Sequence, residues 1–168
     1  TYTMYPIAIQ DQVNAVNVPL SATILDDGGS MVVFPKYGFS NAVIYGYRYD
    51  AVGRFLGNNI RINVGNVFGQ PRIVRNGRDK VTVSWLQNEA ESRVTRASIY
   101  YNNGTVYKSP WQIIQEKVTE STIEGTTDGG FWMGYTYPDV TTGGAPYTVK
   151  MRLYNQEGNV EATLTTYQ

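Results

Sequence analysis

The sequence predicts an all-β protein, folded as a single jelly-roll barrel or sandwich of about eight to ten strands with one short helix. Val, Ile, Tyr and Thr are abundant while Leu is scarce, a composition that favours pleated strands over helices. Apolar and polar residues alternate with a period of two along much of the chain. Turn signals rich in Gly, Asn and Asp separate these stretches. Because 168 residues suit one domain, we assign residues 1–168 to a single β-barrel domain.

The first half of the chain is predicted to consist of strands joined by turns. Asp26-Asp27-Gly28-Gly29-Ser30 is a tight turn, because Gly adopts a positive φ there without a Cβ clash. Pro35 is expected to end a short apolar strand, since proline donates no ladder hydrogen bond. Residues 42–49 are apolar or aromatic on both faces, which indicates a strand that is covered on both sides or faces a partner. Residues 60–64 and 81–85 alternate, so each is expected to have one wet face and one core face. The predicted strands are 1–9, 13–25, 31–34, 42–49, 60–64 and 81–85.

The second half is predicted to hold the helix and the remaining strands. Asn102-Asn103-Gly104 predicts a hairpin between strands at 97–101 and 105–107. Ser109-Pro110-Trp111-Gln112 matches a capping box with Pro at the first helical position, and the apolar residues that follow fall on one side of a helix over 109–120. The alternation in 147–153 is the clearest in the chain and indicates a half-buried strand. Further strands are predicted at 131–137 and 160–167.

Composition excludes several classes of function. Cys and His are absent, which rules out disulfides, Cys/His zinc sites and catalytic units with a His base. Lys+Arg and Asp+Glu are both 14, so the net charge is zero and we expect no direct nucleic-acid binding. No apolar run reaches the roughly 20 residues of a membrane span, and no signal peptide is visible. The low charged fraction of 17% indicates either subunit assembly or an uncharged polar surface.

Acidic and turn motifs have simpler structural explanations than functional ones. Glu116, Glu120 and Glu124 could supply the paired carboxylates of a glycosidase, but their spacing suits a solvated helix face. The Asp-Gly segments 26–30 and 128–130 could offer oxygen ligands to Ca²⁺, yet Asp-Gly is also the commonest way to make a turn.

The basic cluster and the sequon are explained in the same way. Arg72, Arg75, Arg78 and Lys80 could meet phosphates or an acidic partner, but no stacking aromatics are interleaved with them, which favours a solvated hairpin. Asn103-Gly104-Thr105 matches a glycosylation sequon, and a turn is again the simpler explanation. We therefore predict no catalytic residue, no metal, no cofactor and no enzymatic activity.

Aromatic residues at period two carry the strongest functional signal. Fourteen Tyr exceed what a domain of this size usually buries, since each buried hydroxyl needs a partner. Such sets can form a core, a sugar-binding platform or a subunit interface. We predict self-association, as a homodimer or a higher species, through flat strand faces. The candidate interface residues are Tyr45, Tyr47, Tyr49, Phe131, Trp132, Tyr135 and Tyr137.

The chain resembles the small single-β-barrel major capsid proteins of tailless, membrane-containing icosahedral double-stranded DNA bacteriophages, especially those of thermophilic hosts. The resemblance covers the whole chain and lies in its length, its strand content, the predicted helix over 109–120 and the uncharged Tyr-rich strands at 41–49 and 131–137. Membership implies an upright jelly roll packed into capsomers, a second capsid protein as partner, and no catalysis. It also implies synthesis in the host cytoplasm, a final place in the virion capsid, and a position next to an internal virion membrane.

A second resemblance covers only residues 71–168. Val81-Thr82-Val83-Ser84-Trp85 resembles the second strand of a fibronectin type III domain, and Tyr147-x-Val149-x-Met151-x-Leu153-x-Asn155-x-x-Gly158 resembles its sixth strand. The gap between the two segments is longer than that family usually shows. This alternative implies an adhesive module, either fibronectin-like or carbohydrate-binding, in which residues 71–168 form a separate unit.

Overall fold

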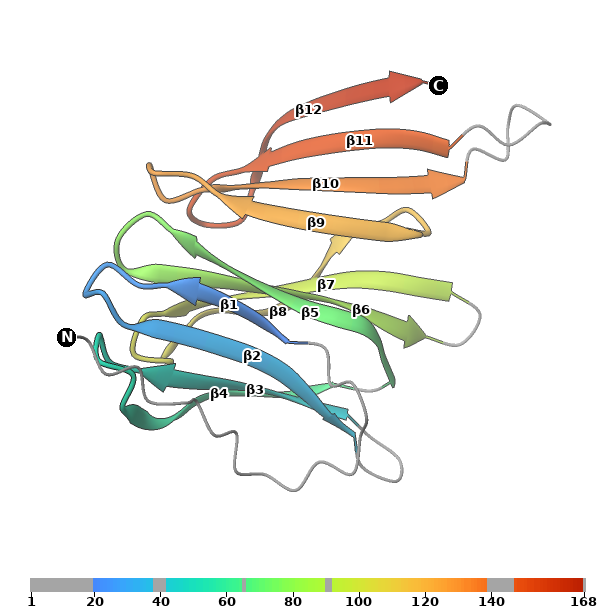
Figure 1. Cartoon of the computed structure of the whole chain (residues 1–168). Coiled ribbons are helices and arrows are strands. Elements are labelled where there is room, and N and C mark those ends of the chain that lie inside the picture. Colours follow the sequence, from blue (N-terminus) through green and yellow to red (C-terminus); the bar gives the residue numbers. More distant parts are fainter. Residues whose placement is uncertain (1–19, 38–41, 65, 90–91, 139–146, 168) are drawn as a thin grey trace.

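A computed structural model describes residues 20–37, 42–64, 66–89, 92–138 and 147–167 of the chain. These residues form twelve strands in three antiparallel sheets of four, and they contain no helix. Each strand pairs only with its neighbours in sequence, so every sheet is an up-and-down meander (Figure 1). The all-β prediction is confirmed, whereas the jelly-roll topology is not, because none of these pairings is a Greek-key connection.

The three sheets follow one another along the chain. The first sheet holds β1 (Ser21–Ile24), β2 (Ser30–Tyr37), β3 (Ala42–Tyr49) and β4 (Phe55–Val64). The second holds β5 (Asn66–Asn76), β6 (Lys80–Glu89), β7 (Ser92–Tyr101) and β8 (Val106–Ile114). The third holds β9 (Glu120–Gly125), β10 (Phe131–Pro138), β11 (Tyr147–Tyr154) and β12 (Val160–Tyr167).

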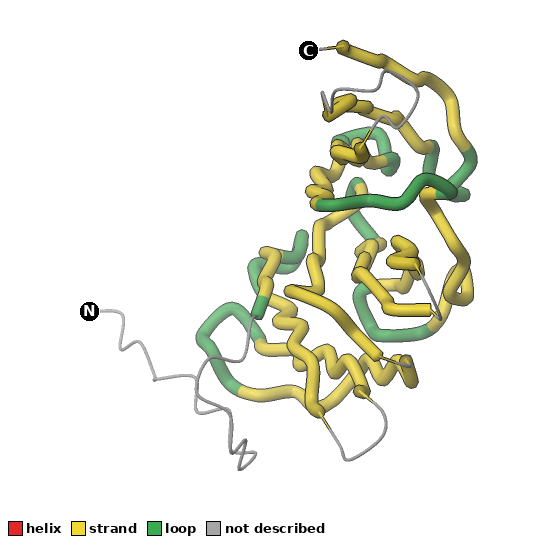
Figure 2. The backbone as a smooth tube through the Cα atoms, turned by 90° about the vertical axis from the view of Figure 1, so that its right-hand side faces the viewer, coloured by secondary structure: helices red, strands yellow, loops and turns green. Residues whose placement is uncertain are grey.

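The sheets are stacked with the second sheet in the middle, as both views show (Figures 1 and 2). Two hydrophobic clusters fill the two spaces between them. One cluster joins the first and second sheets, with Met31, Ile44 and Ile60 packed against Val83 and Trp85. The other joins the second and third sheets through residues that include Ile99, Ile114, Phe131, Met133 and Tyr154. The first and third sheets therefore each have one outer face that no other sheet of the described chain covers.

The central position of β6 corrects the expectation that this strand has a wet face. Thr82 and Ser84 are as completely buried as Val81 and Val83. Their hydroxyls lie on the side that faces the third sheet, and Asn76 Nδ2 donates to Thr82 Oγ1. A polar residue that is buried and hydrogen-bonded within the protein produces the same alternation of apolar and polar residues in the sequence as one that faces water.

The predicted helix over 109–120 is wrong, because residues 106–114 form β8. This strand pairs with β7 through Ala97↔Trp111 and Ile99↔Lys108, and the register shifts between these two pairs. Pro110 lies in the irregular stretch, where its missing N–H breaks no ladder hydrogen bond. The capping-box pattern was a local match that tertiary pairing overrides.

Several predicted strand boundaries shift for similar reasons. β2 continues through Pro35, because β1 pairs only with Ser30 to Val33 and leaves that side of β2 open at the proline. The strands predicted at 42–49 and 160–167 correspond to β3 and β12, and the one at 131–137 corresponds to β10. The predicted strand at 1–9 and the first part of the one at 13–25 lie outside the described residues.

Five hairpin tips share one geometry. In each, the first residue of the tip donates its N–H to the carbonyl of the fifth and accepts from the N–H of the fourth, a glycine with positive φ. This is the three-residue hairpin loop that ends in a left-handed glycine. The five glycines are Gly28, Gly53, Gly104, Gly129 and Gly158.

Candidate functional site

The outer face of the first sheet carries an aromatic strip made of Phe34, Tyr45, Tyr47, Tyr49 and Phe55. The register places Phe34 opposite Tyr45 and Tyr49 opposite Phe55, so the rings come from three neighbouring strands. The intervening residues Ile44 and Gly46 point to the core. The mixed sequence of β3 thus gives an aliphatic inner face and an aromatic outer one.

Four rings of the aromatic strip form a row in which each ring contacts the next. Phe34 lies 4.9 Å from Tyr47 between ring centroids, Tyr47 lies 5.1 Å from Phe55, and Phe55 lies 5.6 Å from Tyr49. The last two pairs are tilted by 57° and 55°, and the first is edge-to-face at 87°. Phe55 is 55% exposed, Tyr45 and Tyr47 are half-buried, and Tyr49 is buried. Burial also raises the pKa of the Tyr49 hydroxyl.

The candidate residues of β10 divide between the two faces of the third sheet. Phe131 and Tyr135 are buried in the second hydrophobic cluster, and Tyr137 packs half-buried against it. Trp132 points the other way, onto the outer face, where it is half-buried opposite Leu153. Of the β10 candidates, only Trp132 therefore shares a face with the exposed apolar residues of this sheet.

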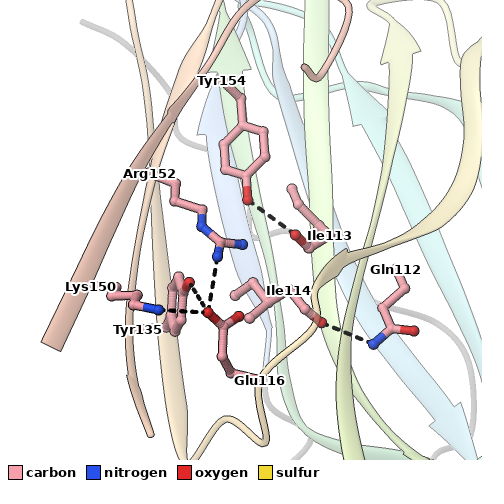
Figure 3. Close-up of polar contacts among 8 residues, drawn as sticks. All are labelled: Gln112, Ile113, Ile114, Glu116, Tyr135, Lys150, Arg152 and Tyr154. Carbon is pink, nitrogen blue, oxygen red and sulfur yellow. Dashed lines mark hydrogen bonds and ion pairs between the residues drawn. The ribbon is translucent and has the colours of Figure 1, made fainter. Parts of the chain in front are cut away.

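A cluster of charges lies where the chain passes from the second sheet to the third (Figure 3). Glu116 follows β8, and its Oε1 accepts from Lys150 Nζ at 2.9 Å, from Arg152 Nη2 at 2.9 Å and from the Tyr135 hydroxyl at 3.2 Å. Arg152 also lies over the Tyr135 ring and Lys150 over the Tyr137 ring, at 5.4 Å and 4.9 Å from the centroids. These contacts hold the segment between β8 and β9 against the third sheet.

The surroundings of Glu116 act on its charge in opposite directions. Burial alone would raise its pKa, but the hydrogen bond from Lys150 and the charges of Arg152 and Lys150 together hold the pKa below its ordinary value. Burial and the charge of Glu116 raise the pKa of Tyr135, so the phenol stays neutral and donates. Glu116 is thus an ionised carboxylate held by two cations, which makes it an anchor between layers.

The polar motifs that sequence analysis set aside take part in the structure of the hairpin tips. Asp27 accepts a hydrogen bond from the Gly29 N–H and forms an ion pair with Arg48. Asp128 accepts a hydrogen bond from the Thr126 hydroxyl. Arg75 lies 3.5 Å from Asp26, and Lys80 lies 4.6 Å from the centroid of the Tyr107 ring. Arg75 and Lys80, two members of the basic cluster predicted from the sequence, therefore have different partners, a carboxylate and an aromatic ring. Within the described residues, no three acidic side chains are grouped closely enough to hold a metal.

One open groove of about 750 Å³ lies between β1, β5 and β9, the first strands of the three sheets. Its lining carries Arg72, Arg75 and Glu124 beside stretches of backbone. Two of its lining residues lie in close contact, because a Cβ on Gly125 would lie only 1.7 Å from the Arg75 carbonyl oxygen. The strands β5 and β9 can approach this closely only because residue 125 is glycine.

Sequence reasoning missed Phe34 and Phe55, and it singled out Glu116 without finding the contacts that it makes. Phe34 lies opposite Tyr45 in the hairpin of β2 and β3. The correct register of that hairpin would have placed Phe34 on the same face as the tyrosines. Phe55 precedes the alternating part of β4 and carried no signal of its own. Glu116 was assigned to a helix face, which hid its connection to β11.

The described chain holds no helix long and apolar enough to cross a membrane. Compared with protein-family models, with curated proteins and with solved structures, the chain matches none.

Proposed function

We propose that this protein is a structural subunit of a larger assembly, which it builds through the flat outer faces of its stacked sheets. The observation that carries the proposal is the aromatic strip, in which Phe55 is 55% exposed and Tyr45 and Tyr47 are half-buried, while Phe34 and Tyr49 are buried beside them. Aromatic side chains are enriched where proteins meet one another, because they bury large apolar areas at a small cost in side-chain entropy.

The specific form that we propose is a viral capsid subunit. Its partners would be further copies of itself and a second capsid protein. Its final location would be the virion, and its source would be a phage of a thermophilic host. The support for this form is the resemblance in length and in Tyr-rich, weakly charged strands. A jelly-roll arrangement in the assembled shell belongs to the same proposal.

A carbohydrate-binding or fibronectin-like adhesive module is the alternative. Sugar platforms need two or three coplanar rings that are accessible. The Tyr47 ring is tilted by 68° from Tyr45 and by 57° from Phe55, and the flatter pair, Phe34 and Tyr45 at 28°, contains a buried ring. The two fibronectin-like segments also do not share a core, because Trp85 packs in the first hydrophobic cluster while Tyr147 and Met151 are 53% and 43% exposed on the third sheet. Both observations favour assembly over adhesion.

Sedimentation velocity over a wide range of protein concentration tests the proposal. We expect dimers or larger species, and we expect Phe55→Glu to weaken their formation at least about tenfold, because it buries a charge in an apolar contact. The control is Thr105→Glu, an exposed position on a hairpin tip of the second sheet. A wild-type protein that stays strictly monomeric, or that binds defined glycans on an array, would contradict the assembly role.

A further inference from the structure

Strand β11 has its polar and apolar faces reversed relative to a normal half-buried strand. Lys150 and Arg152 point inward, where both donate to the Glu116 carboxylate oxygen that also accepts from Tyr135. Met151 and Leu153 point to the outer side of the sheet, and Met151 is 43% exposed. A sheet with one face in water normally places its apolar residues on the core side.

Strand β12 repeats this reversal at the edge of the same sheet. Leu164 pairs with Met151 on the outer face and is 57% exposed, while Thr163 and Thr165 lie on the inner side opposite Arg152 and Lys150. The neighbouring strand β10 adds Trp132, opposite Leu153, to the outer face. The result is a continuous apolar surface over three strands, which we call the outer face of the third sheet. It consists of Trp132, Gly134, Thr136, Pro138, Tyr147, Val149, Met151, Leu153, Ala162, Leu164 and Thr166.

We propose that a second copy of this chain covers the outer face of the third sheet, so that two third sheets pack face to face about a two-fold axis. The inference rests on the proposed assembly role and assigns it a definite dimer contact. None of the eleven residues, which lie on β10, β11 and β12, carries a charge, and the charges on this side of the sheet are Glu120 and Glu124 on β9. Two copies therefore meet there without like-charge repulsion, and the contact is self-complementary, as a two-fold interface requires.

The size of the face fits a dimer. Eight-residue strands extend ~26 Å and the three strands β10, β11 and β12 span ~14 Å, which gives a flat area of about 370 Å² for each copy. With β9 included, the four strands of the sheet span ~19 Å and the whole outer side measures about 500 Å². Two copies together bury about 1,000 Å² before the relief of the side chains is added, which reaches the lower bound of a specific interface.

The rim of the face determines how two copies are oriented. Glu120 and Glu124 of β9 lie at one margin, beside Thr136 and Trp132 of β10. A two-fold axis along the strands places β9 of each copy over β12 of the other, whose outer-face residues Ala162, Leu164 and Thr166 carry no charge. An axis across the strands would instead stack glutamates on glutamates, which Coulomb repulsion disfavours.

Two variants on the same exposed strand test the inference. Leu164→Lys places a charge on the outer face, and we expect the dimer dissociation constant to rise about thirtyfold. Thr165→Lys adds the same charge to the opposite face of β12 and is expected to leave the dissociation constant unchanged. Analytical ultracentrifugation measures both, and circular dichroism confirms that both variants fold.

Cross-linking gives a second measurement, because the chain has no native Cys. Met151→Cys is expected to join two copies through a short bis-maleimide, whereas Thr165→Cys is not. Equal dissociation constants for wild type and Leu164→Lys, or equal cross-linking of the two Cys variants, would overturn the inference. If wild type associates and Phe55→Glu weakens it while Leu164→Lys does not, the assembly role stands and only this contact falls. If wild type is strictly monomeric, both fall.

Discussion

Glu116 connects two layers of the protein through a single carboxylate oxygen. Three donors from β10 and β11 converge on Oε1, and the side chains of Lys150 and Arg152 are about one-fifth exposed. A charge in such a half-buried place is stable only while its partners are present. Nothing in the local sequence marks the contact, because the three donors stand at least 19 positions from Glu116 along the chain.

Replacing Glu116 tests this anchor. We expect Glu116→Gln to lower the free energy of unfolding by about 1–3 kcal/mol at neutral pH, because two cations lose their counter-charge. Urea denaturation at several pH values measures it. Folding lowers the pKa of Glu116 below its ordinary 4.5, so its stabilisation is fully present above pH 4.5 and is lost as the pH falls through the lowered pKa.

The two proteins should therefore differ most at neutral pH and converge in acid. Glu120→Gln is the control, since Glu120 is exposed on β9 and should change stability by less than about 0.5 kcal/mol. A difference between wild type and Glu116→Gln that does not depend on pH would show that the charge is not what holds the layers.

Strand β8 shows at the level of the element why local patterns can mislead. A capping box, a proline and an i, i+3, i+7 apolar set all predicted a helix. The same residues instead pair with β7, and Trp111 packs under Lys108, whose Nζ lies 4.3 Å from the ring centroid and donates to the Glu157 carbonyl at 2.7 Å. Those contacts reach the tip of a distant hairpin, so sequence periodicity alone could not reveal them. By contrast, β3 carries no capping motif that competes with its alternation, and it could be predicted to the residue.

The hairpin tips allow a clean measurement of backbone strain. Gly53 has a φ of +84°, and a Cβ there would meet nothing within 4 Å. Gly53→Ala should therefore cost about 1 kcal/mol of stability from the left-handed backbone alone. Gly53→Asn should cost less, because Asn tolerates this conformation. Thermal and urea unfolding of both variants measure the difference, and an Ala variant as stable as wild type would contradict the assigned turn.

The three-layer stack determines which parts of the molecule can exist alone. The first hydrophobic cluster combines Met31, Ile44 and Ile60 with Val83 and Trp85, so neither side is complete without the other. The all-β class and most strands could be predicted, because alternating apolar and polar residues mark the two faces of a strand in a hairpin. The sequence did not reveal the central layer, because the buried polar residues of β6 resemble a solvated face.

A fragment that begins at Pro71 tests this dependence. We expect it to lack cooperative unfolding and to be digested quickly, because removal of the first sheet exposes Val81, Val83 and Trp85 to water. Circular dichroism melting and limited proteolysis measure this, with the full chain as control. A compact, protease-resistant fragment would instead favour the fibronectin-like alternative.

The strict neighbour-to-neighbour pairing of the strands has a consequence for how the chain is made. Each meander needs no residue that is synthesised later to complete its own hydrogen bonds. As the polypeptide leaves the ribosome, one layer can close before the next has been translated, and only the docking of finished layers remains. The outer face of the third sheet is completed only by β12, so encounters between newly made molecules at that face begin after the first two layers have formed.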